Sequence, residues 1–537
     1  MELSLSALPL SPWALAWGAL LVALSAAAAG VWAWQATFWQ RRGVPTLPMD
    51  PLLGHSRDRL LLRVSAGEQF ARLYRRLAPH PFGGVFQFLR PTFVVRDPEL
   101  IKQIMVKDFS HFEERGLFVN EKTNPLSAHL FSLDGPRWRK LRVKLTPTFT
   151  SGKMKMMFGL MHGCALELCA FLRDAARRRH VVEMKDVVAK FTTDVIGTCA
   201  FGLQFNSLAD PDSEFRRMGK AVFEPTLLLA IRQVVGTFIP QIGNLIKFPP
   251  KNVSDFFLGA VKETVDFREK NNIKRNDFMQ LLIELRNKAE LLDDYENTEL
   301  TGTQNGSVKV NNTQNGTSKD SDDLELTDSL LAAQAFVFFV AGYETSATTM
   351  GFALHELAMN LDVQDKLQAE IDSVLSEHNG EFSYESIQKM SYLHKVVEET
   401  LRKYPPLPNH FRRCTVPYTI PGTKVRLEKG TRVFIPILGL QMDPAYFPHP
   451  HKFDPERFSE ENKATRPRFA YLPFGEGPRN CIGMRFGQLQ TKLGLAVLLH
   501  SYRFTPCDQT LRQVRFEPKA FFTASRGGNW LRLTARH

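Results

Sequence analysis

A short glycine-rich loop near the C-terminal end, with the sequence PFGEGPRNCIG over residues 473–483, limits what this chain can be. Glycines and a proline precede Cys481, which predicts a tight turn with backbone amides free to point at one atom. Residues 484–499 are mostly apolar at helical spacing, so Cys481 is expected where a helix begins. The helix dipole and the loop amides would hold its thiol as a thiolate, which suits an axial metal ligand such as that of haem iron. A small buried hydrophobe after a glycine turn is the alternative for a lone cysteine.

The N-terminal segment differs in kind, because residues 13–34 contain no charged side chain. At about 1.5 Å per residue, a helix of this length spans the hydrocarbon core of a bilayer, which is roughly 30 Å thick. Tryptophans lie toward the ends of the span, as interfacial anchors do, at Trp13, Trp17, Trp32 and Trp34. A cleaved signal peptide would carry its positive charge first, whereas here Glu2 precedes the span and Arg41 and Arg42 follow it. Residues 1–40 are therefore predicted to anchor the chain, with everything after Arg41 in the cytosol.

The composition of the chain indicates its cellular compartment and the kind of partner that it binds. Prolines and a glycine over residues 41–56 predict an extended connector that cannot be helical. Six cysteines without a CxxC pair indicate a reducing compartment. The net charge of +12 comes without a nucleic-acid-binding motif, so a basic surface facing anionic lipid or an acidic protein partner is the better interpretation.

Helical periodicity dominates the body, which predicts a mainly α fold with small peripheral β-sheets (α+β). The helical stretches are residues 154–179, 186–199, 253–270, 275–288, 328–360 and 363–378. Short extended pieces are predicted at residues 85–88, 92–95, 418–420, 432–435 and 530–533. Residues 298–323 are rich in Asn, Gln, Gly, Thr and Ser, with TQNG occurring twice, and are predicted to be a disordered insert in a catalytic domain of residues 57–537. The apolar residues 227–246 suit either an entry channel dipping into the bilayer or ordinary core packing.

Polar residues interrupt the long apolar helix predicted over residues 328–360. A glycine, an acid and a hydroxyl inside such a helix are costly unless something uses them, and here they are Gly342, Glu344 and Thr345. Thr345 can donate to the carbonyl of Ala341 one turn back, while Gly342 leaves space for a ligand. The pattern predicts a polar notch, although helix packing alone could explain it.

Charged residues at helical spacing mark two further helices. Glu399 and Arg402 lie three positions apart on one face of a helix that ends at a Pro-Pro pair, and a solvated surface pair is the usual interpretation. Trp138 and Arg142 share one face of another helix at i,i+4, which alone describes an ordinary basic helix.

Taken in order, these motifs resemble the cytochrome P-450 superfamily over nearly the whole chain from the anchor onward. The haem signature of that family has the spacing of Phe474, Gly477, Arg479, Cys481 and Gly483. Residues 124–131 and 145–154 resemble the insect microsomal group linked to xenobiotic detoxification. The resemblance implies haem b with Cys481 as the axial ligand, in a loop that includes Phe474, Arg479 and Gly483.

The resemblance also implies roles for the other motifs. Trp138 and Arg142 would bind a haem propionate, and Arg412 would bind the second, with the adjacent Arg413 as an open alternative. Gly342, Glu344 and Thr345 would serve oxygen binding and proton delivery. Glu399, Arg402 and Arg457 would form a buried charge network that locks the cysteine loop. Substrate contacts would come from Phe118, Leu130, Phe131, Phe338, Leu407, Phe411, Phe521 and Phe522.

The implied function is a membrane-anchored monooxygenase of the endoplasmic reticulum that acts on lipophilic molecules such as xenobiotics or endogenous lipids. No dinucleotide fingerprint is present, so electrons from NADPH would come through NADPH–cytochrome reductase, with cytochrome b5 as a second donor. Reductase contacts, or simply solvated surface, would include Arg139, Lys140, Lys144 and Arg485. The alternatives are a reductase-independent haem-thiolate isomerase or dehydratase, in which the threonine is commonly lost, and a non-catalytic haem or lipid carrier.

Overall fold

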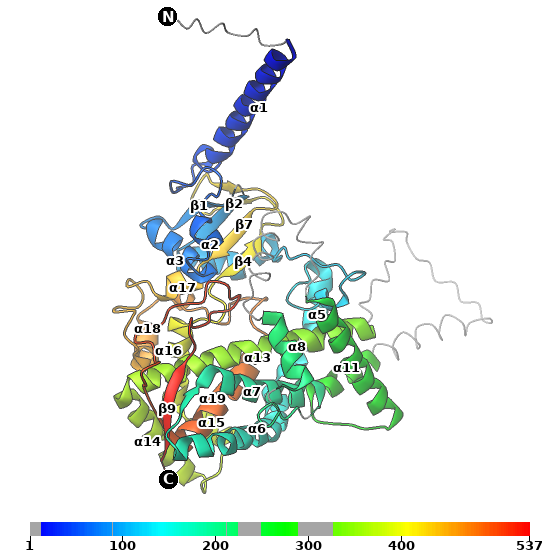
Figure 1. Ribbon diagram of the computed structural model, residues 1–537, viewed down its shortest axis with the longest axis vertical. Coiled ribbons are helices and arrows are strands. Elements are labelled where there is room, and N and C mark those ends of the chain that lie inside the picture. The colour runs from blue at the N-terminus through cyan, green and yellow to red at the C-terminus, as the bar shows by residue number, and fades with distance from the viewer. Residues whose placement is uncertain are drawn as a thin grey trace, which may run out of the picture.

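The computed structural model describes residues 12–88, 90–203, 205–210, 212–223, 249–287 and 326–536. Helices make up most of the body, with the first helix standing apart from it (Figure 1). The described α-helices before residue 288 include α1 (Pro12–Ala36), α2 (Arg57–Leu60), α3 (Ala66–Arg76), α4 (Pro98–Lys102), α5 (Gly135–Leu145), α6 (Ser151–Arg177), α7 (Met184–Ile196), α8 (Glu214–Phe223) and α11 (Lys251–Lys270). The C-terminal half holds α13 (Asp328–Met359), α14 (Leu361–Glu377), α15 (Tyr384–Lys389), α16 (Ser391–Lys403), α17 (Ile437–Gln441), α18 (Glu460–Ala464) and α19 (Met484–Ser501).

Small sheets lie at the edges of this helical body. The strands are β1 (Phe82–Gln87), β2 (Arg90–Val95), β3 (Val181–Glu183), β4 (His410–Arg413), β5 (Tyr418–Thr419), β6 (Arg426–Leu427), β7 (Arg432–Ile435), β8 (Tyr502–Thr505) and β9 (Trp530–Ala535). The largest sheet has the order β1-β2-β7-β4, in which β2 and β7 are parallel and the other pairs antiparallel. The remaining sheets have the orders β3-β9-β8 and β5-β6. The predicted mainly α fold with peripheral sheets is confirmed.

Helix α13 runs through the middle of the helical body. It packs against α7, α11, α16 and α19, and most of its side chains are buried. Such all-round burial explains why its sequence is apolar on every face rather than along one stripe. The helix is therefore a buried, mostly apolar element, in which a polar side chain is exceptional.

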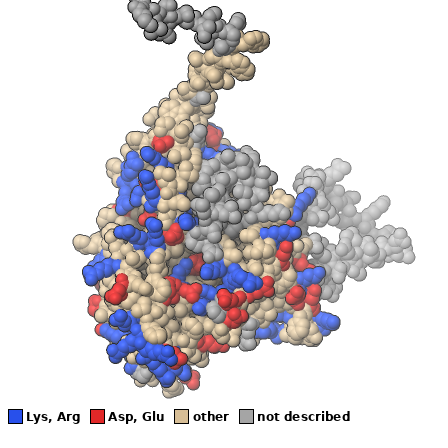
Figure 2. Space-filling model, in the orientation of Figure 1, with Lys and Arg blue, Asp and Glu red and all other residues tan. Residues whose placement is uncertain are grey.

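Among the described residues, three helices are long and apolar enough to span a membrane. Of these, α13 is largely buried and α6 partly buried, whereas the span of residues 16–36 in α1 is not buried at all. In the space-filling view α1 is a rod without charged side chains, while Lys and Arg side chains gather on the body below (Figure 2). Trp13, Trp17 and Trp34 are exposed on this rod. The helix is therefore a candidate anchor.

The connector and the end of the segment before it lie against strand β1. Trp39 is buried, and its Nε1 donates to the carbonyl of Val85 in β1 at 3.1 Å. The backbone N–H of Gly84 donates to the carbonyl of Pro45 at 2.7 Å, and a turn closes between Asp50 and Gly54. Side-chain burial and sheet hydrogen bonds, which proline content does not reveal, hold the connector against β1.

Most predicted helices agree with the structure within a few residues. Residues 186–199 differ in detail, because α7 ends at Ile196 and a π-helix continues over Gly197–Phe201. Residues 278–287 are helical where 275–288 was predicted. The polar insert predicted at 298–323 and the apolar run at 227–246 lie outside the described residues.

Candidate active site

The cysteine loop has the tight geometry that its glycines predict. Gly475 and Gly477 both have positive φ angles, of 69° and 72°. A Cβ on Gly477 would lie 2.1 Å from the carbonyl oxygen of Met105, so only glycine fits there. The N–H of Cys481 donates to the carbonyl of Phe474 at 2.8 Å, and α19 begins after Gly483. The turn therefore presents the sulfur at the start of α19.

Opposing effects act on the pKa of the Cys481 thiol. Burial raises the pKa of this thiol, and the backbone N–H of Gly483, Arg142 and Arg115 oppose that rise without overcoming it. The side chain of Cys481 is exposed toward the cavity, so its sulfur is open to a ligand there. A bound metal ion deprotonates a coordinating thiol outright, so haem iron would hold Cys481 as the thiolate.

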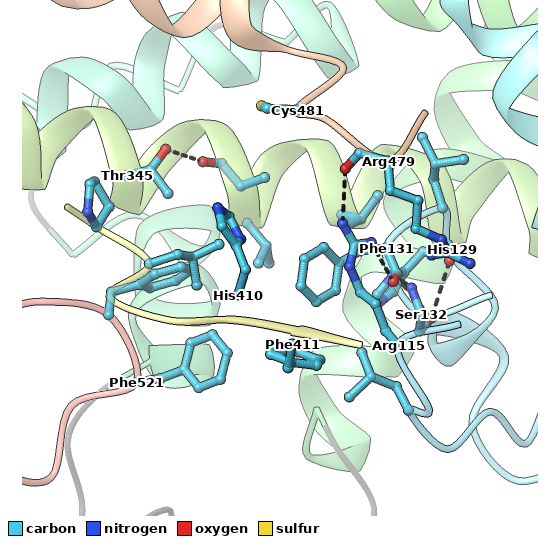
Figure 3. Close-up of a pocket in the computed structure, with 18 of the residues that line it drawn as sticks. Arg115, His129, Phe131, Ser132, Thr345, His410, Phe411, Arg479, Cys481 and Phe521 are labelled. Carbon is cyan, nitrogen blue, oxygen red and sulfur yellow. Dashed lines mark hydrogen bonds between the residues drawn. The ribbon is translucent and has the colours of Figure 1, made fainter. Parts of the chain in front are cut away.

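Thr345 occupies the wall opposite the cysteine loop, on α13 (Figure 3). Its Oγ1 donates to the carbonyl of Ala341 at 2.6 Å, as predicted. The role predicted for Gly342 is only partly met: a Cβ there would lie 2.3 Å from Cδ1 of Ile196. Close packing of α7 on α13 therefore occupies the space that was expected to hold a ligand, although Gly342 still lines the cavity.

Glu344 does not line the cavity. Its carboxylate is buried and forms an ion pair with Lys185 of α7. The ammonium group of Lys185 retains about a quarter of its side-chain exposure, so the pair lies near solvent rather than against the cysteine. The carboxylate also raises the pKa of the neighbouring Tyr343, whose burial has the larger effect.

One cavity is lined by Cys481, Gly342 and Thr345 together. It has a volume of about 1140 Å³ and lies between α13, the cysteine loop and the sheet β1-β2-β7-β4. Aromatic rings crowd the side opposite the cysteine (Figure 3). The cavity wall includes every side chain predicted for substrate contact, namely Phe118, Leu130, Phe131, Phe338, Leu407, Phe411, Phe521 and Phe522.

The structure distinguishes the two neighbouring arginines of β4. Arg413 forms an ion pair with Glu114 and is partly exposed. Arg412 points to the other face of the strand, is 3% exposed, and its Nε has no hydrogen-bond partner among the described residues. Burial, with Arg479 nearby, lowers the pKa of Arg412 to about 9. Arg412 is therefore the arginine with a buried nitrogen that lacks an acceptor, which an anionic group would supply.

Arg479 and Trp138 lie together on the same side of the cavity. The guanidinium of Arg479 stacks 4.1 Å from the ring centroid of Trp138 and donates to Asp134 at 3.0 Å. Its Nε and Nη1 are buried without a hydrogen-bond partner in the described chain. Burial lowers the pKa of Arg479 to about 10. Arg142 completes this side by donating to Asn480.

Arg115 belongs to the same cluster, although the sequence analysis did not single it out. Its Nη1 donates to the carbonyl of Phe131 at 2.8 Å, and its guanidinium lies 4.0 Å from the Phe131 ring centroid. Burial and the positive charges of Arg412 and Arg479 lower its pKa. It stands alone in a loop, so no spacing pattern could have revealed it.

These groups fit haem b. Buried cationic nitrogens without acceptors are costly, and no described residue of the cavity wall is an Asp or Glu. The two propionates of haem would supply the missing acceptors, with Trp138, Arg142, Arg412, Arg479 and Arg115 as their candidate partners. Cys481 is placed to serve as the axial thiolate.

A buried charge network supports the loop from behind. Arg402 and Glu399 are fully buried and meet at 2.6 Å, and Arg457 approaches Glu399 at 3.5 Å. Within the described part of the chain, no hydrogen bond joins Glu399, Arg402 or Arg457 to residues 473–483. Gln441 links the network to the residue that directly precedes the cysteine loop. Its Nε2 donates to the carbonyl of Arg402 at 2.9 Å, and its Oε1 accepts from the N–H of Leu472 at 3.0 Å.

Comparison with known proteins agrees with this site. The family model described as Cytochrome P450 matches residues 59–532. The chain is 41% identical over 511 residues to cytochrome P450 6k1 of Blattella germanica, covering 95% of each chain. It is 42% identical over 504 residues to cytochrome P450 6a8 of Drosophila melanogaster, covering 93% of this chain and 94% of that protein.

Proteins of this family hold haem through a cysteine thiolate and receive NADPH-derived electrons through a reductase. Their insect members of group 6 are generally microsomal membrane proteins. Both the matched range and the identity extend over nearly the full length of the chain. The chain therefore belongs to the cytochrome P450 family, within its insect group 6, and is a haem-thiolate monooxygenase.

Proposed function

We propose that this monooxygenase is held in the endoplasmic reticulum membrane by residues 1–40 and oxidises lipophilic small molecules on the cytosolic side. Residues 41–56 connect the anchor to a catalytic domain of residues 57–537. The reaction is RH + O2 + 2 e− + 2 H+ to ROH + H2O, with electrons from NADPH through a reductase. The observation that carries the proposal is the aromatic cavity of about 1140 Å³ that joins Thr345 to Cys481.

The cavity wall favours apolar substrates. Phe411 lies 6.3 Å from Phe131 between ring centroids, and both face the cavity together with Leu130 and Phe338. Phe118 and Phe521 are exposed and stand where the cavity meets the surface. Such a wall would take up xenobiotics such as plant toxins or insecticides, or endogenous lipids, by burying their apolar surface.

Bound haem supplies dioxygen activation, and the residues of α13 hold the protons that the reaction consumes. The hydroxyl of Thr345 donates to Ala341 and keeps its lone pairs available to a donor in the cavity. Glu344 lies on the adjacent face, ion-paired with Lys185. Exchange of that ammonium for water would let the carboxylate carry a proton from the surface toward Thr345.

Electron delivery is proposed on the cysteine side of the molecule. The acidic face of NADPH–cytochrome reductase, or cytochrome b5 as a second donor, would meet a basic surface. Arg139 and Arg485 are exposed there, and Lys140 and Lys144 are half-buried. Arg139 already pairs with Glu113 at 2.7 Å, which leaves Arg485 as the stronger contact.

Reconstitution of the full-length protein in lipid vesicles with the reductase tests the proposal. We expect an alkyl aryl ether to be dealkylated only when NADPH and reductase are both present. Turnover of a peroxide without reductase would instead support an isomerase, and ligand binding without turnover would support a carrier. A variant lacking residues 1–36 keeps the buried Trp39, so it should keep its activity in detergent but no longer sediment with vesicles. Limited proteolysis of intact microsomes should digest the catalytic domain.

A further inference from the structure

The first half of α13 contains a completely buried amide, that of Gln334. Gln334 lies about three turns before Thr345 and is not part of the cavity wall, so it has no direct access to a substrate. A buried amide is costly unless its donors and its acceptor are paired. Its hydrogen bonds therefore indicate what it does.

The hydrogen bonds that Gln334 makes outside α13 all go to one loop, residues 128–131, which we call the Phe131 loop. Its Oε1 accepts from the N–H of Leu130 at 2.9 Å, and its Nε2 donates to the carbonyl of Ala128 at 3.1 Å. Ala128 and Leu130 are buried, and no other hydrogen bond reaches that N–H or that carbonyl from the described residues. The amide of Gln334 therefore supplies the partners that an irregular buried backbone needs.

Arg115 holds the other end of the Phe131 loop (Figure 3). Its Nη1 donates to the carbonyl of Phe131 at 2.8 Å, and its Nη2 donates to the carbonyl of Arg479 in the cysteine loop at 3.4 Å. The N–H of Leu130 and the carbonyl of Phe131 belong to consecutive residues, so the two attachments fix the backbone between them. The Phe131 loop is thus held between α13 on one side and the cysteine loop on the other.

The Phe131 loop forms part of the cavity wall, because Leu130 and Phe131 both line the cavity. The ring of Phe131 meets that of Phe411 from β4 edge to face, with their centroids 6.3 Å apart. This contact closes the wall between the loop and the strand. Since protein interiors are closely packed, the position of Phe131 decides how much room the cavity has on this side.

We infer that Gln334 is a positioning residue that sets the selectivity of the enzyme for the length of its substrate, through the Phe131 loop. The inference rests on the proposed function, because it concerns which apolar molecules the cavity accepts. Loss of the amide leaves the N–H of Leu130 and the carbonyl of Ala128 buried and unpaired, so the loop must move until both find partners. Phe131 moves with the loop, and long substrates that reach it lose their fit, whereas short ones do not.

Gln364 of α14 provides a matched control, because it makes the same set of hydrogen bonds away from the cavity. It is also completely buried, and its Nε2 donates to the carbonyls of Leu357 and Phe504 at 3.0 and 2.8 Å. Its Oε1 accepts from the N–H of Phe504 at 2.9 Å, and it does not line the cavity. Gln334→Leu and Gln364→Leu should therefore lower the melting temperature to a similar extent, while only Gln334→Leu alters the cavity wall.

Hydrogen exchange and turnover of the full-length holoenzyme with reductase distinguish the two variants. The amide hydrogen of Leu130 should exchange at least about tenfold faster in Gln334→Leu than in the wild-type protein, and at the wild-type rate in Gln364→Leu. The turnover substrates are the pentyl and methyl ethers of umbelliferone. The ratio of kcat/KM for the pentyl ether to that for the methyl ether should fall about tenfold in Gln334→Leu and stay within about twofold in Gln364→Leu.

Gln334→Glu keeps an acceptor for the N–H of Leu130, so its ratio should lie between those of the wild-type protein and Gln334→Leu, and it replaces the leucine variant if that variant does not retain haem. The inference is overturned if exchange at Leu130 is unchanged, if the ratio does not fall, or if Gln364→Leu lowers the ratio equally. Dealkylation of either ether by the wild-type protein leaves the proposed function standing in all three cases. A wild-type protein that dealkylates neither ether overturns both.

Discussion

The guanidinium group of Arg142 donates twice to Asn480, to its carbonyl oxygen at 3.0 Å and to its Oδ1 at 2.6 Å. Asn480 immediately precedes Cys481, so helix α5 holds the cysteine loop by the same residue that faces the cavity. One side chain thereby couples the position of the sulfur to the propionate side of the site. Loss of Arg142 should disturb both at once.

Arg142→Gln should lower the haem content of the purified protein and its melting temperature. Two charge-assisted hydrogen bonds of about 1.5–3 kcal/mol each are lost, together with one propionate partner. The haem-to-protein absorbance ratio and a thermal melt measure both effects. Arg139→Gln, one turn away and exposed, removes the same charge and should leave both values unchanged, because exposed ion pairs contribute little. Equal losses in the two variants would argue against a specific role for Arg142.

Thr345→Ala should uncouple oxygen reduction from product formation. The hydroxyl that donates to Ala341 at 2.6 Å is removed, and with it the donor and acceptor that order protons beside the cavity. Product formed per NADPH should fall by about tenfold or more while NADPH oxidation continues as hydrogen peroxide accumulates. Thr345→Ser keeps the hydroxyl and should restore most of the coupling. Unchanged coupling in the alanine variant would remove Thr345 from the proton path.

Gln441→Leu should release the cysteine loop from the buried network of Glu399 and Arg402. The substitution leaves the N–H of Leu472 and the carbonyl of Arg402 unpaired, at a cost on the order of 2 kcal/mol or more. Stability and haem retention should fall together in chemical denaturation and haem-transfer measurements.

Gln368→Leu is the matched control for that variant. Gln368 is equally buried and donates to the carbonyls of Leu499 and Tyr502, both at 3.0 Å, away from the network. A similar loss of stability is expected with haem retained. Comparable haem loss from both variants would mean that Gln441 has no special connection with the loop.

Acid should destabilise the protein as the pH falls from about 6.5 to about 4. Burial, with the charges of Arg412 and Arg115, lowers the pKa of His410 to about 4. In this window the unfolded chain binds a proton at His410 that the folded chain does not, so the free energy of unfolding rises with pH. His410→Gln keeps a donor for the carbonyl of Leu472. It should reduce the slope of the free energy of unfolding against pH by the equivalent of about one proton.

His180→Gln is the control for pH dependence, since His180 is exposed. Its slope is measured between pH 4 and pH 6.5 under the same conditions as that of His410→Gln. If His410→Gln gives the wild-type slope, His410 is protonated in the folded state and burial does not control its titration.

Local spacing was sufficient to predict the features that lie close together along the chain. The turn at Cys481 follows from its glycines, and the bond from Thr345 to Ala341 follows from helical geometry. The contact between Glu399 and Arg402 follows from their i,i+3 spacing, although their burial does not. Each of these needs only backbone geometry, which a sequence pattern encodes.

Contacts between distant segments could not be predicted in this way. Lys185 reaches Glu344 and Ile196 fills the space at Gly342 only because α7 packs on α13. Arg115 joins the cation cluster because a loop closes over the cavity, and strand alternation in β4 decides between Arg412 and Arg413. These relationships depend on tertiary packing, for which neither periodicity nor residue type carries a signal.

The buried Trp39 has a consequence for how substrates arrive. Its ring lies where any side chain at Gly84 would be, 2.2 Å from an added Cβ, so the end of the anchor and β1 interlock. The strand belongs to the same sheet as β4, whose residues Phe411 and Arg412 line the cavity. If α1 lies in a bilayer, the packing of Trp39 on β1 would limit how far the cavity entrance can move from the membrane surface. Replacing the membrane helix before Trp39 by another should keep the cavity entrance at the same distance from the membrane surface. A flexible linker inserted after Trp39 should let that distance vary.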